Sequence, residues 1–135
     1  MTNILSLPLF KRKFFCVGIA LAVGALIAFT LPAEALVGKP MAQTAIIINA
    51  LVMGFVLTII GVFDWQPVFR IRMHPLWRGA AVAAFVHLDY AITMWPDQPT
   101  FWKVIIIAAV FGAVIDLLAT QLFGEGQQLL KGMTR

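Results

Sequence analysis

Three ionisable residues lie inside long apolar runs, and their side chains are the ones in this sequence most able to do chemistry. They are His87, Asp89 and Asp116. On insertion scales an aspartate at the centre of a membrane helix costs about 2.5–3.5 kcal/mol, so such a residue usually has a function or a partner. A carboxylate at membrane depth can hold a proton or a cation, and an imidazole can relay protons near neutral pH.

Asp116 stands in a row of small residues that recur at helical spacing: Ala109, Gly112, Ala113, Ala119 and Thr120. Small residues mark the faces on which membrane helices pack, so we expect Asp116 to face protein rather than lipid. One interpretation is a proton or cation site in the inner half of the membrane. The favoured interpretation is a structural partner for Arg78, whose long side chain can reach along its helix.

His87 lies on a similar row of small residues, near the middle of its apolar run. It is either a proton relay or a neutral histidine hydrogen-bonded to a neighbouring helix, and the second is favoured. Asp89 follows two residues later, about 200° away around a regular helix, so the two side chains should not face the same point. Asp89 is expected to line an outer vestibule or to reach the lipid headgroups.

Weaker candidates are the uncharged polar residues Asn49, Thr58 and Gln121. Each is expected to form a hydrogen bond between helices, worth about 0.6–2 kcal/mol. A basic segment with Arg70, Arg72 and Arg78 can lie on anionic lipid or bind a cytoplasmic partner. The preference of basic residues for the cytoplasmic side of a membrane is by itself sufficient to explain the charge of this segment.

Four apolar runs must position these residues, and they cover 14–31, 42–63, 79–95 and 101–123. Each is close to the roughly 20 residues that cross a hydrocarbon core, and only helices satisfy their backbone groups there. The chain is 61% hydrophobic and 12% charged, whereas soluble domains have about 25% charged residues. The sequence predicts one all-α domain, a four-helix transmembrane bundle of two antiparallel hairpins joined by a loop at 64–78.

Proline and tryptophan support these runs, because all seven prolines and all four tryptophans lie outside the runs or near their ends. Proline breaks helix interiors, and tryptophan prefers the membrane interface. Eight of the ten basic residues fall on one side of the four-span arrangement. This predicts cytoplasmic N- and C-termini, in what we expect to be a bacterial cytoplasmic (inner) membrane.

The charge of +4 then reports orientation, and no nucleic-acid partner is expected. An alternative for the first run is a secretory signal that ends at Ala33-Glu34-Ala35. Its apolar stretch is longer than the usual 7–15 residues of such signals, which favours a membrane span.

Recognisable catalytic chemistry is missing from the sequence. The lone Cys16 excludes an internal disulfide and a cysteine-based zinc site, and no nucleotide-binding, nucleophile-elbow or zinc-protease motif occurs. We therefore expect no enzymatic activity, no cofactor and no metal.

Two functions remain. The favoured one is a structural or accessory subunit of a membrane protein assembly, bound to lipid and to copies of itself or other membrane subunits. The alternative is a small oligomeric proton- or ion-coupled transporter or channel that uses Asp116 and His87. A faint similarity between Ile48–Gly54 and Ile106–Gly112 agrees with the internal repeats of some transporters.

Overall fold

The structure, a computed structural model, describes residues 7–32, 41–63, 65–66 and 71–130. Its helices are α1 (Pro8–Thr30), α3 (Ala42–Ile60), α4 (Pro75–Val86), α5 (Leu88–Ile92) and α6 (Gln98–Phe123), followed by the 3₁₀ helix η2 (Gly126–Leu130). Two short strands, β1 (Trp65–Gln66) and β2 (Ile71–Arg72), pair antiparallel between α3 and α4. Apart from this two-residue pairing the described chain is helical, and the predicted all-α class is confirmed.

Three helices are long and apolar enough to cross a membrane, namely α1, α3 and α6. The region predicted as a third span, 79–95, is not a single helix. Helix α4 begins earlier, at Pro75, because His74 caps it: the His74 Nδ1 atom accepts a hydrogen bond from the Leu76 N–H at 3.3 Å. Proline suits the first position of a helix, where its missing N–H has no partner to lose.

The break between α4 and α5 falls at His87, whose backbone leaves helical geometry at φ −91° and ψ 3°. The Ala83 carbonyl accepts the His87 backbone N–H at 3.1 Å. The same carbonyl oxygen lies 2.9 Å from the His87 Nδ1 atom. A carbonyl only accepts, so Nδ1 carries the proton in this bond. The Ala83 carbonyl thus accepts from both the backbone and the side chain of His87 at the break. A side chain that binds a helix carbonyl competes with the backbone hydrogen bonds of the helix.

The other predicted boundaries shift by a few residues. Helix α1 begins at Pro8 rather than at residue 14, so the basic residues 11–13 are helical. Helix α3 ends at Ile60 rather than at 63, and α6 begins at Gln98 rather than at 101. In α6, as in α4, a proline in the first turn allows an earlier start.

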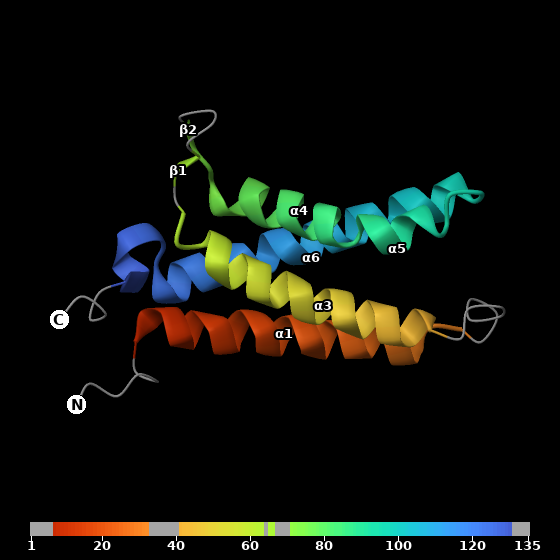
Figure 1. The fold of residues 1–135 in the computed structure, drawn as a ribbon, viewed down its shortest axis with the longest axis horizontal. Coiled ribbons are helices and arrows are strands. Elements are labelled where there is room, and N and C mark those ends of the chain that lie inside the picture. Colours follow the sequence, from red (N-terminus) through yellow and green to blue (C-terminus); the bar gives the residue numbers. More distant parts are fainter. Residues whose placement is uncertain (1–6, 33–40, 64, 67–70, 131–135) are drawn as a thin grey trace.

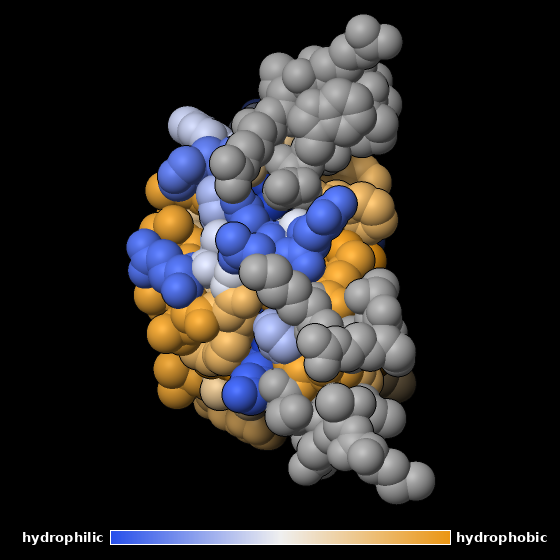
Figure 2. Space-filling view, turned by 90° about the vertical axis from the view of Figure 1, so that its left-hand side faces the viewer, coloured by the Kyte–Doolittle hydropathy of each residue, from blue (hydrophilic) through white to orange (hydrophobic). Residues whose placement is uncertain are grey.

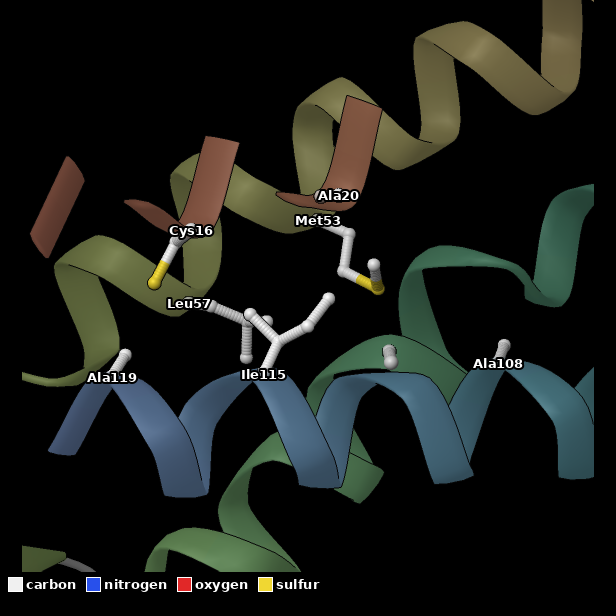
Figure 3. Close-up of a cluster of buried hydrophobic side chains, with 8 residues drawn as sticks. Cys16, Ala20, Met53, Leu57, Ala108, Ile115 and Ala119 are labelled. Carbon is white, nitrogen blue, oxygen red and sulfur yellow. The ribbon is translucent and has the colours of Figure 1, made fainter. Parts of the chain in front are cut away.

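The helices form two antiparallel pairs, α1 with α3 and α4–α5 with α6 (Figure 1). In the row of small residues around Asp116, Gly112, Ala113 and Ala119 are buried and Ala109 and Thr120 are half-buried. Small residues are also buried in the other helices, among them Ala20 and Gly24 in α1, Gly54 in α3 and Gly79 in α4, which meets Gly112 of α6. Larger side chains fill the centre between the pairs. Figure 3 shows Leu57 of α3 and Ile115 of α6 pointing toward one another, with Cys16 and Met53 beside them.

One end of the molecule carries the start of α1, the β1–β2 pair, the end of α6 and η2, and we call it the β1–β2 end (Figure 1). Hydrophilic residues gather in the middle of this end and hydrophobic residues surround them (Figure 2). The sides of the helices expose large apolar side chains such as Phe29, Phe85 and Leu122. This distribution suits contact with lipid along the helices and with water at the end.

We predict that Gly79→Ala destabilises the protein by about 1–3 kcal/mol, the usual cost of overpacking. A Cβ atom on Gly79 would lie 2.7 Å from the Cβ of Asp116 and would overlap the Gly112 carbonyl. Reversible unfolding of the purified protein in detergent measures the effect. Gly18→Ala is the control, since no described atom beyond the backbone of its own helix turn lies within 4 Å of a Cβ there. Equal stability of the two variants would contradict the close α4–α6 contact.

Candidate functional site

Asp116 lies at the centre of a buried charge cluster near the β1–β2 end. Its side chain is 0% exposed, and guanidinium groups from two other helices contact it, Arg12 of α1 and Arg78 of α4. The Arg78 Nε atom donates to Asp116 Oδ2 at 2.8 Å, and Arg78 Nη2 donates to Oδ1 at 3.3 Å. The Arg12 Nη2 atom donates to the same Oδ1. The carboxylate thereby joins α1, α4 and α6.

Further acceptors complete the charge cluster, which comprises Arg12, Arg78, Asp116, Thr120 and Glu125. The Thr120 hydroxyl oxygen accepts from Arg12 Nη1 and from Arg78 Nη2, each at 3.1 Å. The Glu125 Oε2 atom accepts from Arg78 Nη1 at 3.1 Å. Two positive and two negative side chains thus balance one another, which is the condition under which charges can be buried.

Glu125 reaches this position because of a glycine. Helix α6 ends at Phe123, and Gly124 follows with φ +82°, a backbone conformation that other residues rarely adopt. The Gly124 carbonyl accepts a hydrogen bond from Arg12 Nη1 at 3.1 Å. The turn therefore supplies one acceptor directly and places the Glu125 carboxylate beside Arg78.

Arg12 is the functional residue that the sequence interpretation missed. Arg12 is one of the eight basic residues that predict the orientation. Its side chain is nevertheless 0% exposed, whereas Lys11 beside it is exposed. Gly61 makes room for it, since a Cβ there would overlap the guanidinium group. The available signal was spacing: Arg12 extends the row of buried residues Cys16, Ala20, Gly24 and Ala28 by one further step of four.

The geometry of Asp116 favours the structural interpretation. Both carboxylate oxygens already accept hydrogen bonds from guanidinium groups, so a cation brought to them would meet two fixed positive charges. The predicted pairing with Arg78 is present. Asp116 faces protein as expected, because Gly79 and Gly112 let α4 approach α6 beside it.

The other ionisable candidates lie elsewhere. His87 is half-buried at the α4–α5 break, and no hydrogen bond or ion pair in the described part of the chain joins it to Asp89 or Asp116. Asp89 is exposed, and its Oδ1 atom accepts from the Asn49 Nδ2 atom at 3.0 Å, which links α5 to α3. Asn49 thus makes a hydrogen bond between helices.

The remaining candidates do not join a site. The Thr58 hydroxyl donates to the Gly54 carbonyl of its own helix at 2.9 Å, and its side chain also makes a hydrogen bond with the Cys16 thiol of α1. Gln121 is exposed on α6. Arg70 and the Ala33-Glu34-Ala35 segment lie outside the described residues, and only the backbone of Arg72 is described, in β2.

A cavity of about 590 Å³ lies toward the opposite end, between the two helix pairs. We call it the interhelical cavity. Its walls come from α1, α3, α5, α6 and the α5–α6 turn, and its polar residues are His87, Tyr90, Thr93, Asp97 and Thr100. Its volume is in the range of about 300–1,000 Å³ that small-molecule sites usually have.

Comparison with known proteins returned no match among protein families, curated proteins or solved structures. Among the residues that the structure describes, no group of three or more His, Cys, Asp or Glu residues is placed to hold a metal ion.

We predict that Asp116→Asn lowers the free energy of unfolding by about 3–5 kcal/mol, the cost of removing one partner from a buried ion pair. Two buried guanidinium groups would then lose their shared counter-charge. Unfolding in detergent measures this loss. The matched control is Asp89→Asn at an exposed carboxylate, for which we expect a change below about 1 kcal/mol. Similar values for both variants would mean that the cluster does not hold the helices together.

Proposed function

We propose that this protein is a four-span membrane protein that acts as a structural or accessory subunit of a membrane assembly. The spans are α1, α3, α4–α5 and α6, with the β1–β2 end in the cytoplasm of a bacterial cell. Three of these helices have the length and composition of membrane spans. The basic residues near the start of α1 and around β1–β2 support the orientation.

The observation that carries this proposal is an open pair of small residues on α1. Gly18 is exposed, with no described atom beyond the backbone of its own helix turn within 4 Å of where its Cβ would lie, and Ala22 is exposed one turn later. The buried Gly24 of α1 lies against Ala50 of α3, whereas Gly18 and Ala22 face away from the described part of the bundle. Two small residues four apart let the backbone of another membrane helix approach closely.

The state of Asp116 supports the same proposal. Its carboxylate is occupied by two arginines, so the most conspicuous intramembrane charge is used to hold this chain's own helices together. A chain whose helices are held together in this way, and whose α1 exposes the Gly18–Ala22 pair, suits a role in assembly. The partner is a transmembrane helix, either of another membrane subunit or of a second copy.

We predict that the double variant Gly18→Leu, Ala22→Leu loses its partner, because two leucines would hold the facing helix away. Native mass spectrometry of the protein purified in mild detergent measures the result. The wild type should appear above the chain mass of 14.9 kDa, and the double variant should appear at that mass. Ala81→Leu, at an exposed alanine on α4, is the control and should remain assembled. A wild type found only at the chain mass would contradict the proposal.

The second candidate function is a proton- or ion-coupled transporter or channel, and the position of His87 favours it. His87 lines the interhelical cavity at the break between α4 and α5. Interrupted helices with polar groups near mid-membrane are typical of transporter sites. In this candidate Asp116 and its arginines close the path at the β1–β2 end.

The transporter candidate predicts that His87→Gln lowers proton flux into proteoliposomes at least tenfold, because an amide cannot take up and release a proton as an imidazole does. A pH-sensitive dye inside the vesicles measures the flux. His74→Asn is the control: it removes a histidine at the β1–β2 end and keeps a side chain that caps helices. Equal flux in the wild type and His87→Gln would reject this candidate.

A further inference from the structure

The interhelical cavity is built asymmetrically. The residues contributed by α1 and α3 are all apolar: Ala20, Val23, Gly24, Ile27, Leu31, Ile46, Ala50 and Met53. The polar residues come from the break at His87, from α5 and the turn that follows it, and from the first turn of α6. A ligand that fills this space must therefore present an apolar surface to one helix pair and a polar group to the other.

The cavity is also long. On α1 it extends from Ala20 near mid-helix to Leu31 at the helix end, which is about 16 Å at 1.5 Å per residue. Its inner part is lined by Ala20, Met53 and Ala108. Two of these three are alanines, so the helices leave the space unfilled. The two helix pairs diverge toward this end (Figure 1), which opens the cavity away from the charge cluster.

The charge of the lining selects the kind of ligand. Among the described residues that line the cavity, Asp97 is the one charged side chain, and there is no lysine or arginine. The Thr100 hydroxyl donates a hydrogen bond to Asp97 Oδ2. An anionic head group would meet Asp97 without a cationic partner, whereas a cation would find its counter-charge there.

Further lining groups agree with a cation. The His87 Nδ1–H donates to the Ala83 carbonyl, so Nε2 of the neutral imidazole is an acceptor. Tyr90 also lines the cavity, and aromatic faces attract cations. A carboxylate, further acceptors and an aromatic ring are the groups that bind an organic ammonium or phosphonium ion.

We propose that the interhelical cavity is a binding site for an amphipathic organic cation, with its apolar body between α1, α3 and α6 and its charge near Asp97. This inference does not depend on the accessory role, because the cavity and the Gly18–Ala22 pair share no residue. For the transporter candidate, such a cation would be the cargo.

The test is equilibrium dialysis of labelled tetraphenylphosphonium against the full chain in nanodiscs of zwitterionic lipid, with empty nanodiscs subtracted. We expect saturable binding. Tetraphenylborate, which has the same shape and the opposite charge, should show no saturable component. Asp97→Asn should weaken binding about three- to fivefold, the effect of one partly exposed ion pair. The Asp97 side chain makes no capping hydrogen bond at the start of α6, so α6 should still begin normally in Asp97→Asn.

A filling variant tests the location. Val104 lines the cavity, whereas Val110 on the same helix is exposed and does not. Val104→Trp should abolish saturable binding and Val110→Trp should preserve it, with helical circular dichroism unchanged in both. Saturable binding of the borate, equal affinity of Asp97→Asn and the wild type, or equal affinity of the two tryptophan variants would each overturn the proposal. The accessory role is tested by native mass spectrometry, so failure of the binding experiment would reject the cation site alone.

Discussion

The ion pairs that Asp116 makes with Arg12 and Arg78 are the interaction on which the arrangement of the helices depends. Apolar side chains gain little by leaving lipid for one another, so helices in a membrane associate through close packing and polar contacts. Small residues provide the packing within each helix pair, as where Gly79 of α4 meets Gly112 of α6. The carboxylate of α6 then holds Arg12 of the other pair, which makes the cluster a cross-link between the pairs.

The place of this cross-link along the bundle explains the shape of the rest. Because the charges sit near the β1–β2 end, the two pairs are held together there and diverge toward the other end (Figure 1). The interhelical cavity occupies the space between them. A weaker link, the hydrogen bond from Asn49 to Asp89, joins α3 to α5 on this side.

The sequence predicted the all-helical class, the faces on which helices pack and the Asp116–Arg78 pair, because small residues and charges in apolar runs carry strong physical constraints. It did not predict the burial of Arg12, because the first apolar run begins at residue 14, after the basic residues 11–13. In a sequence, a buried arginine looks like any other basic residue near a membrane. The break at His87 was also missed. It is accompanied by an imidazole bound to the Ala83 carbonyl, and a composition pattern cannot reveal that contact. The cavity depends on how two helix pairs diverge, which no local pattern encodes.

Helix α1 connects the two proposed activities, because it carries small residues on two of its faces. The row from Arg12 to Ala28 faces the bundle and ends beside the interhelical cavity, where Gly24 and Ile27 form part of the wall. Gly18 and Ala22 face outward. A partner helix on the outer face would therefore lie against the same helix whose inner face forms part of the cavity wall. Partner and ligand would then act on the same helix from opposite sides, without competing for the same surface.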